Sequence, residues 1–139
     1  MRYLITLALI GLTLSSQAYA CRDPNSGNTV FFESIPNPQP VADLIAEVSL
    51  SDVDEEARPA KAVATVKIIH HISDARIREG ERLVMRYGVS SCGPDLVNSR
   101  VKEGMIIARV SADSDGRLVL YPYIRTYDNR RVTPPSMSK

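Results

Sequence analysis

Five segments of this chain alternate apolar and polar side chains, and this period of two restricts the fold more than any other feature. The clearest is Val41–Leu50, in which every second residue from Ala42 onward is apolar. Such alternation is typical of a half-buried β-strand. The chain is therefore predicted to be mainly β. The other four segments are Ala62–Ile72, Arg82–Gly88, Met105–Val110 and Leu118–Tyr123.

The connections between these segments indicate how the strands are arranged. Asp95–Val101 follows the third segment and has room for about two helical turns, whereas Ser111–Gly116 has the composition of a tight turn. Five strands with a short helix between the third and the fourth give the order of an OB-type Greek-key barrel. Barrel closure also removes the edges that an open sheet would expose. The alternative is a β-sandwich, which usually has seven or more strands.

The alternation also predicts which side chains face the barrel interior. In the second segment we expect Ala64, Val66 and Ile68 to face inward, and in the third Leu83, Met85 and Tyr87. The segment that precedes the first strand, Arg22–Gln39, is interrupted by prolines and a glycine. It is predicted to be an irregular arm around Val30-Phe31-Phe32, with one short strand at most.

The first 20 residues have the three regions of a cleaved export signal. Arg2 supplies the positive charge, Tyr3–Leu14 forms the apolar run, and the small residues Ala18 and Ala20 occupy the cleavage positions. The apolar run is shorter than the roughly 20 residues of a membrane-spanning helix. We therefore predict a signal peptide at residues 1–20 and an extracytoplasmic protein, periplasmic or secreted, with no stable membrane span.

Removal of the signal from the 139-residue chain leaves 119 residues, the size of one domain. We predict an OB-fold domain at residues 21–124 and a flexible polar tail at 125–139. Only one of the 17 basic residues leaves with the signal, so basic and acidic residues balance at 16 each and the formal charge is zero. A neutral chain without tryptophan lacks the basic field and stacking aromatics of general nucleic-acid binders. No nucleic-acid partner is predicted.

The two cysteines, Cys21 and Cys92, are predicted to form a disulfide. They are the only cysteines in the chain, and an exported protein meets an oxidising environment. A bond across this separation of 71 residues would be worth about 4 kcal/mol in the chain-entropy model. Two distant cysteines are too few ligands for a metal site.

Cys21 has a second interpretation, because a cysteine directly after a signal is also where bacterial lipoproteins are lipidated. Lipoprotein signals usually carry Leu three residues before that cysteine and a small residue two before it, whereas this chain has Ala18 and Tyr19. Lipidation would also leave Cys92 as an unpaired thiol. An envelope lipoprotein with a structural role is kept as an alternative.

Several motifs together resemble the netrin-like module, and in particular the N-terminal domain of tissue inhibitors of metalloproteinases. They are the cysteine at the predicted mature N-terminus, a first strand of the type Ala42–Val48, a second strand rich in Lys and Ile, and Val89–Gly93 after the third strand. This resemblance covers most of residues 21–123. It implies an OB-type barrel and a disulfide between Cys21 and Cys92.

The resemblance also implies a function for one residue. In the inhibitors, the α-amine and carbonyl of the N-terminal cysteine chelate the catalytic zinc of the target protease, and the matching residue here is Cys21. An amine with a pKa near 8 deprotonates readily on a metal, and the carbonyl oxygen completes a five-membered chelate. Inhibition of a metalloprotease is therefore one alternative function.

Three further motifs invite a ligand but have simpler interpretations. His70 and His71 are neighbours on a strand and so are expected to point to opposite faces. Asp113–Gly116 resembles the start of a calcium loop but lacks its later ligands, and is predicted to be a hairpin turn. The acidic residues of the connection after the first strand are expected to be solvated. They are Asp52, Asp54, Glu55 and Glu56.

Aromatic and cationic side chains gather near the C-terminus and form a candidate partner surface. Tyr and Arg are enriched at protein interfaces, although the same residues also fit a last strand followed by a solvated tail. They are Tyr121, Tyr123, Arg125 and Tyr127, with Arg130 and Arg131 beyond them. No nucleophile–base motif, phosphate loop or metalloprotease motif occurs. The sequence therefore predicts a non-catalytic protein that binds a protein partner, with no cofactor and no metal of its own.

Overall fold

The computed structural model describes residues 27–128 and 130–137, and these residues form eight strands. Five strands are longer than three residues, and each matches one of the segments predicted from the alternation. The strands are β1 (Asn28–Thr29), β2 (Leu44–Asp54), β3 (Ala60–Ile72), β4 (Arg82–Tyr87), β5 (Glu103–Ala112), β6 (Leu118–Pro122), β7 (Ile124–Thr126) and β8 (Val132–Thr133).

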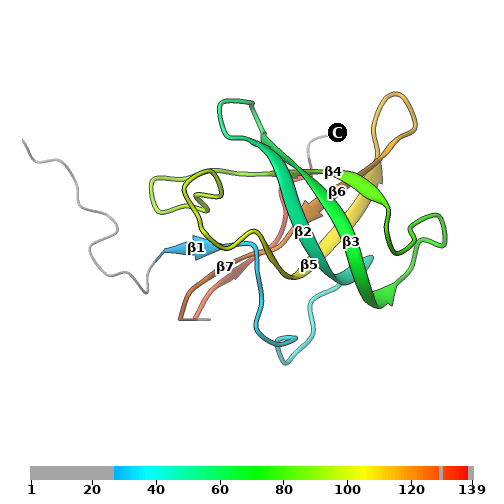
Figure 1. The fold of residues 1–139 in the computed structure, drawn as a ribbon. Coiled ribbons are helices and arrows are strands. Elements are labelled where there is room, and N and C mark those ends of the chain that lie inside the picture. The colour runs from blue at the N-terminus through cyan, green and yellow to red at the C-terminus, as the bar shows by residue number, and fades with distance from the viewer. Residues whose placement is uncertain (1–26, 129, 138–139) are drawn as a thin grey trace, which may run out of the picture.

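The five longer strands close into a barrel in the order β2-β3-β4-β6-β5 (Figure 1). All neighbours are antiparallel except β4 and β6, which run parallel and close the barrel through two registered pairs, Val84 with Val119 and Met85 with Leu120. The mainly β class and the closed five-stranded barrel are thereby confirmed, and the topology is consistent with an OB-type barrel.

Apolar side chains from every barrel strand fill the interior. On β2 and β4 the buried residues follow the predicted alternation, so Leu83, Met85 and Tyr87 face inward as expected. Ile77 and Leu96 come from loops and are each 3% exposed, because they pack into the same core cluster. The core also includes Leu44, Ala46, Val48, Leu50, Ala62, Ala64, Val66, Ile106, Ala108 and Leu120.

Ile68 was predicted to face the barrel interior, but its side chain is 47% exposed. The register against β2 explains this: Val66 pairs with Val48, but Ile68 pairs with the next residue, Glu47. Lys67 is therefore an extra residue, a β-bulge that reverses the facing of Ile68 and Ile69. Ile69 packs against the core in place of Ile68.

The helix predicted at Asp95–Val101 does not form, and residues 27–128 and 130–137 contain no helix. Asp95 accepts a hydrogen bond from the Asn98 amide at 3.0 Å, which closes one turn. The carbonyls of Leu96 and Val97 then accept bonds from the Lys102 ammonium group, so they are not used in a helix. The segment instead lies over the barrel, where the Leu96 amide donates to Glu55 at 2.6 Å.

The two ends of the described chain cover an apolar patch on the outside of the barrel. Ile45 and Ile107 point outward from β2 and β5 but are fully buried, because Phe32 and Tyr123 pack over them. Each large side chain buried in this way contributes about 2 kcal/mol. We call these four residues the outer cluster, and Figure 1 shows β1 and β7 side by side beyond one end of the barrel.

The arm before β2 is held to β5 at a glycine. Phe32 donates its amide to the Met105 carbonyl at 2.8 Å, and the ring of Phe31 lies directly on Gly104. A Cβ on Gly104 would lie 2.8 Å from that ring, so only glycine permits this approach. Phe31 therefore joins the barrel core while Phe32 joins the outer cluster.

Arg125 is the polar link between the two chain ends, and its side chain is 5% exposed. Its Nε donates to the Phe31 carbonyl at 2.7 Å, and its Nη1 donates to the carbonyls of Thr126 and Tyr127 at 3.1 Å each. The guanidinium also lies 5.8 Å from the ring centre of Phe32, within cation–π distance. One buried side chain thus satisfies carbonyls of both the arm and the C-terminal strand.

The C-terminal segment also differs from the prediction. A flexible tail was expected from residue 125, but β7 pairs with β1 and β8, and ordered strands continue to Thr133. The three pair into a small sheet outside the barrel, and Val132 packs against the outer cluster. Within the described residues no helix is long and apolar enough to cross a membrane.

Replacing Arg125 with methionine is predicted to destabilise the protein by about 3 kcal/mol, because buried carbonyls of both chain ends lose a charged donor. Urea unfolding at pH 7 measures this change. Arg131→Met is the matched control, since Arg131 is exposed and its removal should cost less than about 0.5 kcal/mol. Equal stability of the two variants would show that Arg125 does not hold the chain ends.

Candidate functional site

A groove of about 500 Å³ lies where three distant segments meet. Its residues come from β1, from the connection after β4, and from the segment that starts at the end of β7. We call it the Cys92 groove. It is lined by Asn28, Ser90, Cys92, Thr126, Asp128, Arg130 and Arg131.

Hydrogen bonds fix these three segments relative to one another. The Asn28 amide donates to the Cys92 carbonyl at 2.8 Å, and the Asn28 side chain donates to Ser90 Oγ at 3.4 Å. On the other side of β1, the Tyr127 amide donates to the Gly27 carbonyl at 2.9 Å. The groove is therefore framed by paired backbone.

Gly93 makes the close approach between β1 and the Cys92 segment possible. Its φ of +95° lies in the region that favours glycine, and a Cβ here would lie 3.0 Å from the Asn28 carbonyl oxygen. Ser90 and Gly93 also bond to each other, with the Ser90 hydroxyl donating to the Gly93 carbonyl at 2.7 Å. The Val89–Gly93 motif thus forms a compact turn against β1.

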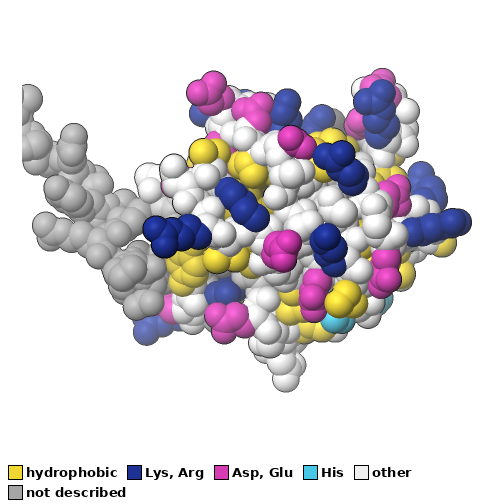
Figure 2. Space-filling model, viewed as in Figure 1, with side chains coloured by type: hydrophobic (Ala, Val, Ile, Leu, Met, Phe, Trp, Pro, Cys, Tyr) yellow, Lys and Arg dark blue, Asp and Glu magenta, His cyan; other side chains and the backbone are white. Residues whose placement is uncertain are grey.

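The charged side chains of the groove give it a small positive excess. Asp128 pairs with Arg130 at 3.2 Å, and its pKa lies below the ordinary value because the Thr126 hydroxyl, the Arg130 amide and the Arg130 cation all favour the carboxylate. Arg131 is exposed and adds a second cation. Over the face shown in Figure 2, by contrast, positive and negative side chains are interspersed.

The structure separates the four residues predicted for the partner surface. Tyr121 and Tyr123 are 7% and 8% exposed, and Arg125 is buried beneath the arm. The Tyr123 hydroxyl donates to the Val41 carbonyl at 2.7 Å, which is a structural role. Tyr127 alone of the four is exposed, at 53%, and it lies beside the Cys92 groove.

Cys21, the residue predicted to form the disulfide and the zinc-chelating terminus, lies outside the described residues. The disulfide with Cys92 therefore stays a prediction. Cys92 itself is half-buried, and its carbonyl bonds to Asn28, seven residues after Cys21. A stretch of seven residues reaches roughly 24 Å at full extension, so the chain before β1 is long enough to return to Cys92.

His70 and Asp113, also singled out from the sequence, have partners within the chain. His70 Nε2 lies 3.3 Å from Glu47 Oε1, and the described residues contain no group of three metal donors. Asp113 accepts the amides of Asp115 and Arg117 at 2.9 Å each, which confirms the predicted turn between β5 and β6.

Three of the four acidic residues at and after the end of β2 have partners on the barrel, although the side chains of Asp52 and Asp54 stay 67% and 42% exposed. Asp52 pairs with Arg82 at 3.2 Å and Asp54 with Lys61 at 3.4 Å. Glu55 accepts a hydrogen bond from the Tyr87 hydroxyl at 3.2 Å. Burial of this hydroxyl raises its pKa above the usual range, and the negative charge of Glu55 is the second cause. These carboxylates hold the β2–β3 connection in place.

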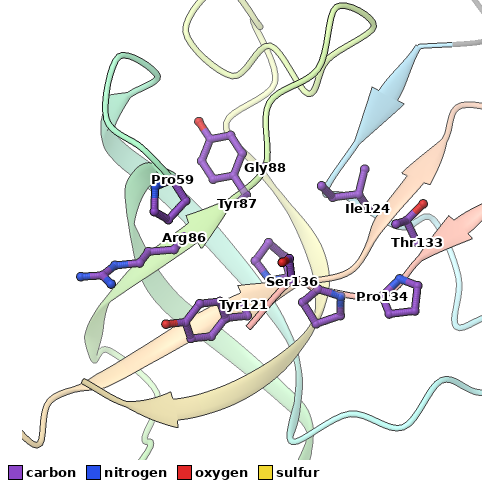
Figure 3. Close-up of a pocket in the computed structure, with 11 residues that line it drawn as sticks. Pro59, Arg86, Tyr87, Gly88, Tyr121, Ile124, Thr133, Pro134 and Ser136 are labelled. Atoms are coloured by element: carbon purple, nitrogen blue, oxygen red, sulfur yellow. The ribbon is translucent and has the colours of Figure 1, made fainter. Parts of the chain in front are cut away.

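A second concavity of about 400 Å³ lies where β4 and β6 separate (Figure 3). We call it the seam groove, and it shares no lining residue with the Cys92 groove. Most of its side chains are apolar. They are Pro59, Arg86, Tyr87, Gly88, Tyr121, Pro122, Ile124, Thr133, Pro134, Pro135 and Ser136.

Comparisons with models of protein families, with curated proteins and with solved structures found no match for this chain. The netrin-like resemblance is therefore a proposal that rests on the motifs alone. Asn28, Thr126 and Asp128 were not singled out from the sequence, because their place at the groove depends on pairing across most of the chain.

Gly93→Ala is predicted to destabilise the protein by roughly 3 kcal/mol, through the unfavourable φ and the contact with the Asn28 carbonyl. Gly116→Ala is the matched control: Gly116 also has a positive φ, +76°, but a Cβ there meets nothing within 4 Å. Its cost should be about 1 kcal/mol. Equal losses in urea unfolding would mean that the approach of β1 to Gly93 is not tight.

Proposed function

We propose that this chain is an exported, non-catalytic protein that binds a protein partner through the Cys92 groove and the exposed ring of Tyr127. The observation that carries the proposal is the convergence of β1, the Ser90–Gly93 turn and the residues after β7 at one concave surface. Export rests on the predicted signal at residues 1–20.

The chemistry of this surface favours a protein partner. Tyr and Arg dominate the energetics of protein interfaces, because each combines a large contact area with directional hydrogen bonding. Tyr127 and Arg131 lie at or beside the groove, and both are exposed. The backbone beneath them is hydrogen-bonded, so a partner would meet a surface with little conformational entropy to lose.

The net positive charge of the groove favours an acidic segment on the partner. Arg130 is partly neutralised by Asp128, but Arg131 has a side chain with no acidic neighbour within salt-bridge distance among the described residues. A carboxylate on the partner would accept two parallel hydrogen bonds from such a guanidinium.

Inhibition of a metalloprotease is a second candidate function, and one observation favours it. The bond from the Asn28 amide to the Cys92 carbonyl brings the start of the described chain beside Cys92. A Cys21–Cys92 disulfide would then present the Cys21 α-amine near the groove, where it could chelate the zinc of a docked protease. In this case the groove would be the docking surface around the chelating terminus.

The double variant Tyr127→Ala/Arg131→Ala is predicted to weaken partner binding at least tenfold without changing the urea midpoint. Immobilised mature protein would be used to capture the partner from envelope and culture fluid, and the purified partner would be titrated against each variant. Ile68→Ala/Arg117→Ala is the matched control, since it removes an exposed apolar and an exposed cationic side chain elsewhere.

Equal affinity of the two double variants would refute the Cys92 groove as the binding surface. If the captured partner is a zinc protease, one added alanine before Cys21 separates the two functions. Chelation predicts that inhibition is lost while binding through the groove persists in weakened form. Inhibition unchanged by the added alanine would exclude the Cys21 α-amine as the zinc ligand.

A further inference from the structure

Arg130 and Arg131 form an exposed pair of basic residues in the connection between β7 and β8. The Arg130 side chain is 87% exposed, and Arg131 is exposed as well. In Figure 1 the hairpin that β7 forms with β8 points away from the barrel. Exposed loops with polar residues are preferred sites of proteolytic nicking. Arginine is also the side chain that trypsin-like serine proteases select, because an aspartate lies in their specificity pocket.

The peptide bond between the two arginines is well placed for hydrolysis. Among the described residues no donor is bonded to the Arg130 carbonyl, so its oxygen can enter the oxyanion hole of a protease without losing a partner. The Arg131 carbonyl, by contrast, accepts the Thr126 amide at 2.9 Å. Arg130 Nε lies 3.2 Å from an Asp128 carboxylate oxygen, but an ion pair this exposed contributes little stability. The Arg130 side chain is therefore available to a specificity pocket.

Other exposed arginines lie in loops that the barrel holds more firmly. Arg76 and Arg78 flank Ile77, which is 3% exposed and packs in the core. Arg100 lies in the segment that follows Leu96, which is also 3% exposed and part of the core. An opening wide enough for a protease would withdraw one of these apolar side chains. β8 is held to β7 by two registered pairs, so its opening costs less.

The residues that follow Arg130 bury little of their own surface. Residues 131–137 contain no buried side chain: Val132 and Pro135 are half-buried, and the other five are exposed. In the intact chain, the tether holds this segment at an effective concentration on the order of 1 mM. Cleavage removes that advantage, so in a micromolar solution the segment is diluted about a thousandfold. Arg125 precedes the cut, and its hydrogen bond to the Phe31 carbonyl stays in place. We therefore expect the segment to dissociate while the barrel and the arm remain.

Such a cut changes the charge of the Cys92 groove. Its lining carries two cations, Arg130 and Arg131, and one anion, Asp128. Loss of the segment removes Arg131, and hydrolysis leaves a carboxylate at the new C-terminus on Arg130. One cation then stands beside two anions, so the positive excess of the intact groove becomes a negative one. An acidic segment that is attracted to the intact groove is repelled by the cleaved one.

We propose that the Arg130–Arg131 bond is a processing site for a trypsin-like serine protease, and that its cleavage releases the residues from Arg131 onward and ends the binding of acidic partners by the Cys92 groove. Water adds across the amide: the C–N bond breaks, Arg130 retains the carbonyl carbon as a carboxylate, and Arg131 leaves with a protonated α-amine. The position of the cut stands on the geometry of the hairpin. Its effect on binding rests on the function proposed for the groove.

The position of the cut is tested by treating the folded mature protein with a trace of trypsin and following the products by intact-mass spectrometry. Among the bonds of residues 27–137, the Arg130–Arg131 bond should be cut first, with release of residues 131–139. Arg130→Gln should slow removal of the C-terminal segment at least about tenfold, because the remaining arginyl bond has a hydrogen-bonded carbonyl. Arg131→Gln is the matched control: it removes the same charge but keeps the scissile carbonyl, so the rate should stay within about twofold.

Two results would overturn the processing site: a first cut at Arg76, Arg78 or Arg100, or equal rates of cleavage in the two variants. A native mass spectrum of the cleaved protein tests the release of the segment. If residues 131–139 stay bound to the cleaved protein, their release is refuted.

The effect on binding is measured by NMR titration of a capped hexaglutamate peptide in low salt, with intact and with trypsin-cleaved protein. The cleaved protein should bind at least about tenfold more weakly, and the shifts in the intact protein should include the Thr126 amide. Equal affinity, or no binding to the intact protein, would overturn the regulation. A peptide that binds Tyr127→Ala/Arg131→Ala as tightly as the intact protein would instead refute the groove as the binding surface, and the cleavage masses would still decide the processing site.

Discussion

The buried guanidinium of Arg125 is the interaction on which the arrangement of the chain ends depends. The barrel carries Ile45 and Ile107 on its outer face, and only the arm and the residues after β6 cover them in the described structure. Hydrogen bonds from Arg125 to the carbonyls of Phe31 and Tyr127 connect the arm to the C-terminal segment. This connection places β1 beside β7, and the pair forms one side of the Cys92 groove. The Cys92 groove is thus a consequence of how the outer cluster is covered.

Much of the barrel could be predicted, because a half-buried strand must alternate and its period is visible in the residues themselves. The predictions from the sequence were wrong where a single residue changed the local geometry. Lys67 is one residue too many for the β2–β3 register, and nothing in its identity distinguishes a bulge from an ordinary outward position. The helix at Asp95–Val101 was predicted from length alone, but Lys102 takes up carbonyls that a helix would need.

The candidate site was less predictable because its parts are joined by pairing over long distances in the sequence. The Val89–Gly93 motif was visible in the sequence, and two residues of its turn, Ser90 and Cys92, line the groove. The sequence does not mark Asn28 and Thr126 as site residues, since strands as short as theirs show no periodic pattern. Arg125 and Tyr123 have side chains of the types enriched at interfaces, which predicts a surface, yet here they satisfy carbonyls within the chain.

The central claim is that the chain ends and the barrel form one cooperative unit, and native-state hydrogen exchange tests it most directly. The account predicts that the Phe32 amide, bonded to Met105, and the Tyr123 amide, bonded to Ile107, open with free energies within about 1 kcal/mol of that of Ala46 in β2. The account would be contradicted if the Phe32 and Tyr123 amides exchanged through openings that cost only a small fraction of the free energy needed to open Ala46. The arm and β7 would then be loose attachments, and the Cys92 groove would not be a preformed surface.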